Sequence, residues 1–309
     1  MTLRTSLFAS AIAIFASTSA YAASCDKITM ADPGWTDITA TTAATSTVLK
    51  ALGYKVETKM LALPVTFAGL ASNDLDVFLG AWLPTMEADL GPYREAGTID
   101  TIRTNLEGAK YTLATNEAGA ALGIKDFNDI AAHAAALDGK IYGIEPGNDG
   151  NRLLLGMVDG GTFGLKDFAI VESSEQGMLA EVARATQAGK PIIFLGWEPH
   201  PMNANFKLTY LTGGDDVFGP DFGGATVATT TRKGYAAECP NVGKLLNNLV
   251  FSLQMENEIM GAILNDSEEA DDAAEAWLKA NPTVWQAWLD GVTTKDGGNA
   301  IEAVTAKLD

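Results

Sequence analysis

Tryptophans that lie beside a glycine recur at the ends of three predicted strands. Trp82 and Trp197 each follow a Phe-Leu-Gly sequence and come before a proline, in residues 78–84 and 194–199. Trp35 follows Gly34 after the first apolar run. Ligands of open α/β sheets bind beyond the carboxyl ends of the strands. One such tryptophan could simply be a hydrophobic plug, but the repetition favours a shared cleft that the three indoles line, at least two of them from different lobes.

Several indole faces are suited to binding a quaternary ammonium ion, because its charge is spread over methyl groups and it has no N–H donor. Each desolvated aromatic face contributes up to about 2 kcal/mol. Sugars also stack on tryptophan, but a sugar site needs many charged and amide side chains, and the segments around these indoles contain no Lys or Arg. Trp277, Trp285 and Trp288 lie in a helical C-terminal stretch and are expected to pack in the core or between helices.

The sequence contains few residues or motifs that are typical of catalytic sites. It contains two histidines, His133 and His200, which lack metal-ligand spacing. It has no G-x-S-x-G elbow, Walker A loop or G-x-G-x-x-G motif. We therefore expect a binding protein rather than an enzyme, with no cofactor and no metal.

Short apolar runs alternate with amphipathic stretches, which is typical of an α/β fold. Strands are expected at residues 27–30, 75–79, 98–103, 110–114 and 191–195, and a helix at residues 37–52 with Asp37 as a possible N-cap. The length suits one large or two medium domains. The formal net charge of −18 disfavours binding to nucleic acid.

The N-terminus has the pattern of a secretory signal peptide. Arg4 precedes an apolar run, and residues 20–22 form an Ala-x-Ala cleavage site, so residues 1–22 are expected to be removed after export. Cys25 and Cys239 then remain, and in an oxidising compartment we expect them to form a disulfide rather than two free thiols. That bond would place the start of the mature chain and its last quarter in one unit.

Five segments together resemble the periplasmic choline-binding proteins of choline ABC transporters, within the glycine betaine and proline betaine branch of type II substrate-binding proteins. These segments are residues 32–39, 77–84, 105–111, 142–151 and 194–202. The likeness extends over nearly the whole mature chain.

The resemblance implies two lobes, each a central sheet flanked by helices, joined by two hinge crossings. Residues 24–112 and 224–309 would form lobe 1, and residues 113–223 lobe 2. It also implies a periplasmic location, an inner-membrane ABC permease as partner, and a monomer.

The resemblance further implies the ligand contacts. An aromatic box around the trimethylammonium group would consist of Trp35, Trp82, Tyr111 and Trp197, and the hydroxyl end of choline would meet Asp37 and Asn148.

Alternatives remain at the polar positions and for the function. Asp37 could serve only as a helix cap, and turn chemistry alone would select Asn148. Glu145, Asp149 and Glu198 flank these motifs, where they could raise the negative potential at the cleft mouth or simply belong to the solvated surface. The ligand could be glycine betaine or another trimethylammonium compound, although an ionised Asp37 would repel a carboxylate. A periplasmic hydrolase of choline esters and a sensory module are the alternatives of other classes.

Overall fold

The structure of the protein, a computed structural model, describes residues 25–309. The predicted signal peptide, residues 1–22, lies outside the described residues. Within residues 25–309, no helix is long and apolar enough to cross a membrane.

Nine strands form one mixed sheet in the described part of the chain, in the order β2-β1-β3-β9-β4-β7-β5-β6, with β8 paired to β4. The strands are β1 (Lys27–Asp32), β2 (Lys55–Met60), β3 (Val77–Leu83), β4 (Ile99–Thr115), β5 (Lys140–Tyr142), β6 (Ala169–Val171), β7 (Ile193–Glu198), β8 (Thr209–Tyr210) and β9 (Gly224–Arg232). The long strands β4 and β9 occupy the middle of this order, and the shorter parallel strands lie on either side. This is the two-lobed α/β fold expected from the sequence.

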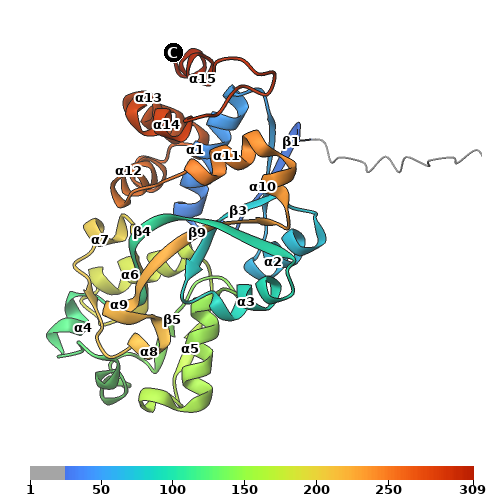
Figure 1. The fold of residues 1–309 in the computed structure, drawn as a ribbon. Coiled ribbons are helices and arrows are strands. Elements are labelled where there is room, and N and C mark those ends of the chain that lie inside the picture. The colour runs from blue at the N-terminus through green and yellow to red at the C-terminus, as the bar shows by residue number, and fades with distance from the viewer. Residues whose placement is uncertain (1–24) are drawn as a thin grey trace, which may run out of the picture.

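Helices cover the sheet in two groups (Figure 1). In the first lobe, with β1, β2 and β3, lie α1 (Thr36–Ala51), α2 (Leu63–Ser72), α3 (Glu87–Glu95), α10 (Tyr235–Glu238), α11 (Pro240–Asn248), α12 (Leu253–Leu264), α13 (Ala270–Ala280), α14 (Pro282–Trp288) and α15 (Ala300–Leu308). In the second lobe, with β5, β6 and β7, lie α4 (Glu117–Ala121), α5 (Asp149–Gly160), α6 (Glu175–Gln187), α7 (Met202–Asn205), α8 (Asp215–Phe218) and α9 (Pro220–Gly223). Three short 3-10 helices, Phe127–Asp129, Ala131–His133 and Thr162–Gly164, complete the second lobe.

The C-terminal helices return to the first lobe, where α12 and α13 pack against α1. Trp285 and Trp288 are buried in this group, as expected. The predicted disulfide between Cys25 and Cys239 is confirmed, with a Cα–Cα distance of 5.6 Å. It joins the residues just before β1 to the segment between α10 and α11, so the first described residues and the last quarter of the chain belong to one lobe.

The repeated tryptophan motif has a structural counterpart in β3 and β7. β3 pairs in parallel with β1 and antiparallel with β9, whereas β7 pairs in parallel with β5 and antiparallel with β4. Each motif therefore ends beside one of the two long central strands. Trp82 and Trp197 are the next-to-last residues of these strands and do not lie beyond them. Trp35 lies between β1 and α1.

Two sequence-based boundaries are wrong. Residues 98–103 and 110–114 are parts of the single strand β4, because register shifts against β9 allow the polar segment between them to stay in the sheet. Within that segment the buried Asn105 amide donates to the Leu79 carbonyl oxygen at 2.8 Å and to the Thr229 hydroxyl at 3.0 Å. Asp37 is not the N-cap of its helix, since α1 begins at Thr36 with Trp35 in the capping position.

Candidate functional site

A cavity lies where the two lobes meet. Its lining residues are Trp35, Asp37, Trp82, Met86, Tyr111, Ile144, Asp149 and Trp197. Five of the six predicted ligand-binding residues are therefore brought together from segments that are far apart in sequence. Met86, Ile144 and Asp149 were not predicted as contacts, because a single methionine or isoleucine beside a strand has no pattern that distinguishes it from the core.

Tyr111 lies between two indoles of the aromatic box. Its ring centroid is 6.0 Å from that of Trp82 and 6.2 Å from that of Trp197, with interplanar angles of 60° and 83°. The register of β4 against β7 places Tyr111 directly opposite Trp197. Phe218 contacts Tyr111 at 5.9 Å between ring centroids. Neighbouring rings thus limit the movement of Tyr111.

Carboxylates hold two of the indoles in place. The Trp82 Nε1–H donates to Asp37 Oδ2 at 3.0 Å, and the Trp35 Nε1–H donates to Glu145 Oε1 at 2.7 Å. Both contacts use the edge of the indole. The negative ring faces, which attract cations, take no part in these bonds.

Asp37 is a buried carboxyl in the first turn of α1. Burial, and to a smaller extent the nearby Glu175 carboxylate, raises its pKa to about 7, against the opposing effect of the bond from Trp82. A bound cation beside Asp37 would relieve this unfavourable burial of charge. The side chain therefore suits a cationic ligand, and its role is not that of a helix cap.

Two further carboxyls are more buried than the sequence suggested. Asp149 is 2 % exposed and lines the cavity, and burial raises its pKa to about 6. Burial also raises the pKa of Glu145 to about 7. Asp149 is therefore not a solvated residue at the cleft mouth, whereas Glu145 is half-buried. No Lys or Arg is among the described residues that line the cavity, so the site has only negative formal charge.

Asn148 is not among the residues that line the cavity. It is the N-cap of α5, where its Oδ1 accepts from the Asn151 N–H at 2.9 Å, and its amide donates to the Glu145 carbonyl oxygen. Turn and capping chemistry accounts for these bonds. A direct contact between Asn148 and a ligand stays a prediction.

Gly150, in the first turn of α5, has no room for a side chain. A Cβ atom there would lie 1.9 Å from Tyr111 Oη and 2.9 Å from Leu195 Cδ1. Gly150→Ala is therefore expected to displace Tyr111 and to weaken binding of a ligand in the box about tenfold, since overpacking costs about 1–3 kcal/mol. Gly156→Ala is the matched control, because a Cβ atom at this position of the same helix has no neighbour within 4 Å. Equal affinity of the two variants, measured by calorimetric titration, would contradict the placement of Tyr111.

A hydroxyl, a carboxylate and an imidazole meet near the cavity, but not in the order of a catalytic triad. The Glu175 carboxylate lies between Thr36 and His200, so the imidazole does not contact the hydroxyl. His200 Nδ1 accepts from the Met202 N–H at 2.9 Å, which places the ring proton on Nε2, facing Glu175. The imidazole thus has no free lone pair to activate a nucleophile. None of the three residues lines the cavity.

Comparison with known proteins places this geometry among transport proteins. Residues 26–280 match the family described as the substrate-binding domain of ABC-type glycine betaine transport systems. An ABC-transporter choline-binding protein, solved in complex with choline, is 67% identical, with a TM-score of 0.91 over 92% of this chain and 99% of that one. The unliganded, semi-closed form described under the same name has a TM-score of 0.85 over the same shares of the two chains, also at 67% identity. Lactococcal OpuAC with glycine betaine is 25% identical, with a TM-score of 0.77 over 85% of this chain and 99% of that one.

Proposed function

Because the chain belongs to the family of substrate-binding domains of ABC-type glycine betaine transport systems, we propose that it captures choline for an ABC importer. The matched family and the similar structures are binding proteins and not enzymes. The choline-bound structure that is 67% identical supports choline as the ligand.

The lining of the cavity carries the proposal. Four aromatic rings and two carboxyls face a space without a basic side chain. This combination favours an organic cation that needs no hydrogen-bond acceptor for its charged end. Micromolar affinity requires about 8 kcal/mol, and each face supplies at most about 2 kcal/mol before ordering costs. Closure of the lobes and polar contacts must therefore contribute as well.

In the proposed complex, Trp35, Trp82, Tyr111 and Trp197 surround the trimethylammonium group. Asp37 accepts a hydrogen bond from the hydroxyl of choline, and Asn148 meets the same end of the ligand. An ionised Asp37 would repel the carboxylate of glycine betaine at the equivalent position. The position of Asp37 in the cavity supports this preference for choline.

The ligand is enclosed, in this proposal, by hinge closure of a lobe formed by residues 24–112 and 224–309 onto a lobe formed by residues 113–223. β4 and β9 lie in the middle of the sheet, between the shorter strands of the two lobes, which supports hinge crossings near residues 112 and 224. Contacts between the lobes also fit a closed form, since Arg152 of α5 donates to the Thr85 carbonyl oxygen at 2.7 Å and to Asp89 at 2.8 Å.

The proposed role determines the expected location, transport partner and oligomeric state of the protein. We expect export to the periplasm with cleavage near Ala22, delivery of choline to an inner-membrane permease, and a monomer in solution. The signal-like N-terminus and the disulfide support export.

Small-angle scattering tests the proposed closure. Saturating choline is expected to reduce the radius of gyration of the mature protein, and the tryptophan fluorescence should change at the same ligand concentrations. Glucose and glycine serve as negative controls. If glucose or glycine compacted the protein and choline did not, the proposed function would be wrong.

A further inference from the structure

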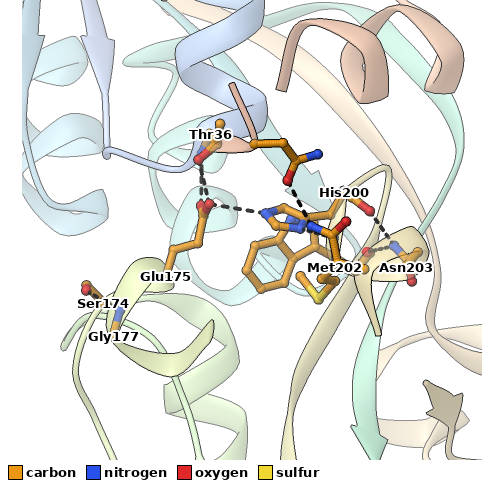
Figure 2. Close-up of polar contacts among 10 residues, drawn as sticks. Thr36, Ser174, Glu175, Gly177, His200, Met202 and Asn203 are labelled. Atoms are coloured by element: carbon orange, nitrogen blue, oxygen red, sulfur yellow. Dashed lines mark hydrogen bonds and ion pairs between the residues drawn. The ribbon is translucent and has the colours of Figure 1, made fainter. Parts of the chain in front are cut away.

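The Glu175 side chain lies between the lobes, outside the aromatic box. It is the first residue of α6 in the second lobe, and it is 1 % exposed. Its carboxylate accepts two hydrogen bonds from Thr36 of the first lobe, from the N–H at 2.9 Å and from the hydroxyl at 2.5 Å (Figure 2). Thr36 lies between Trp35 and Asp37, both of which line the cavity.

These bonds supply a cap that helix α1 lacks in its own sequence. Its N-cap residue is Trp35, which makes no side-chain capping bond. The Thr36 N–H has no acceptor within its own helix and lies at the positive end of the helix, where a carboxylate is stabilising. Glu175 occupies this position from the opposite lobe, while its own helix is capped by Ser174, whose hydroxyl accepts from the Gly177 N–H at 3.0 Å. The α1 N-terminus therefore receives this carboxylate only when the lobes are together.

On the second lobe, Glu175 is tied to the opposite wall of the box. His200 Nε2 donates to Glu175 Oε1 at 3.2 Å, and the His200 ring contacts the Trp197 ring at 4.9 Å between centroids. Asn203 fixes the same turn by donating to the carbonyl oxygens of Trp197 and His200 (Figure 2). One carboxylate is thus bonded to the segments that carry Trp35 and Trp197, which lie on different lobes.

Burial distinguishes this contact from the Arg152–Asp89 ion pair, which also joins the lobes. The Arg152–Asp89 pair has side-chain exposures of 38% and 20%, so water screens it. Glu175 and His200 have side-chain exposures of 1% each, and hydrogen bonds to a buried charge are among the strongest in proteins.

We propose that Glu175 is a positioning residue for ligand binding, which holds the lobes closed by joining the N-terminus of α1 to the turn that carries Trp197. The carboxylate acts through Thr36 and His200 and does not touch the ligand. This inference rests on the proposed function, because it assigns to Glu175 the retention of choline in the closed cleft. It adds a second set of contacts, separate from the box, that determines how long the ligand stays bound.

The test compares Glu175→Gln with Glu181→Gln. Glutamine offers one carbonyl oxygen where the carboxylate offers two, so three donors compete for a single acceptor. Glu181 lies on the same helix and pairs with Arg184 in a more exposed position, which makes it the matched control. Thr36→Val removes the hydroxyl and keeps the N–H, so its effect should be intermediate.

Stopped-flow tryptophan fluorescence with choline is the first measurement. Glu175→Gln is expected to accelerate choline dissociation about tenfold or more, with a small change in the association rate and in the thermal unfolding of the ligand-free protein. Glu181→Gln should behave like the unaltered protein. Equal dissociation rates in the two variants would overturn the proposal. A loss of thermal stability in Glu175→Gln that was large enough to explain its faster choline dissociation would also overturn it.

Amide hydrogen exchange at Thr36 gives a second result that does not depend on choline. A 67% identical choline-binding protein is semi-closed without ligand, so we expect the ligand-free protein to sample the closed form, in which Glu175 accepts from the Thr36 N–H. Glu175→Gln is then expected to accelerate exchange of this amide, because the amide loses its carboxylate partner. If the unaltered protein failed to bind choline, the proposed function would be wrong, and the exchange rate would still decide the role of Glu175. An exchange rate identical to that of Glu181→Gln would exclude the contact between the lobes.

Discussion

Replacement of Trp197 by alanine is expected to weaken choline binding about 100-fold. The variant loses one aromatic face, which contributes up to about 2 kcal/mol, and it also opens the box to water. A total loss of about 3 kcal/mol corresponds to about two orders of magnitude in affinity. Trp197 also contacts Tyr111 and His200, so its removal loosens the neighbouring wall. Trp82→Ala should have a similar effect, since Trp82 lies on the other side of Tyr111.

Trp277→Ala is the control for these variants. Trp277 is half-buried in α13, and its Nε1–H donates to Glu258 at 2.6 Å, away from the cavity. We expect this variant to lower the thermal unfolding temperature and to keep the choline affinity of the unaltered protein. Calorimetric titration of the three variants separates the roles, and equal affinities would mean that the box is assigned to the wrong residues.

The second large effect concerns charge, and it depends on pH. Burial raises the pKa of Asp37 to about 7, so the carboxyl is mostly protonated at pH 6 and mostly ionised at pH 8. A cation binds the ionised form more tightly, so the affinity for choline should rise with pH through about 7. If only the ionised form bound, the increase from pH 6 to pH 8 would be about tenfold. Glu145 and Asp149 are protonated over neighbouring pH ranges and should add to the slope.

Asp37→Asn is expected to reduce both the affinity at pH 8, by about tenfold, and the slope between pH 6 and pH 8. The same change should improve binding of glycine betaine, because its carboxylate no longer meets a negative charge. Glu198→Gln is the control for a general effect of charge. Glu198 follows Trp197 in β7 and forms its ion pair with Lys110 at 3.8 Å. A pH profile for Asp37→Asn that matched the profile for Glu198→Gln would contradict the role of Asp37.

The sequence predicted those parts of the site that depend on a repeated local pattern. Trp82 and Trp197 follow the same apolar strand sequence, and the fold uses the two strands in the same way, each beside a long central strand. The disulfide was predictable because only two cysteines are present. These inferences needed no knowledge of which residues meet across the cleft.

Contacts between distant segments were not predictable in this way. Asp37 has the position of a helix cap in the sequence, but its carboxylate turns to the Trp82 indole, forty-five residues away. Glu175 has the local pattern of an ordinary first residue of a helix, and its partner Thr36 lies 139 residues earlier. Asp149 is a polar residue in a glycine-rich turn, where only the packing of the second lobe reveals that it is buried. In each case the deciding interaction is tertiary, and capping or turn propensity gives no sign of it.

Isothermal titration calorimetry of the mature protein with choline, acetylcholine, glycine betaine and carnitine tests the central claim most directly. The aromatic box together with the Asp37 carboxyl predicts that choline binds most tightly and that glycine betaine binds more weakly at pH 8 than at pH 6. Absence of choline binding at submillimolar protein and ligand, together with binding of a sugar or an amino acid, would contradict the claim.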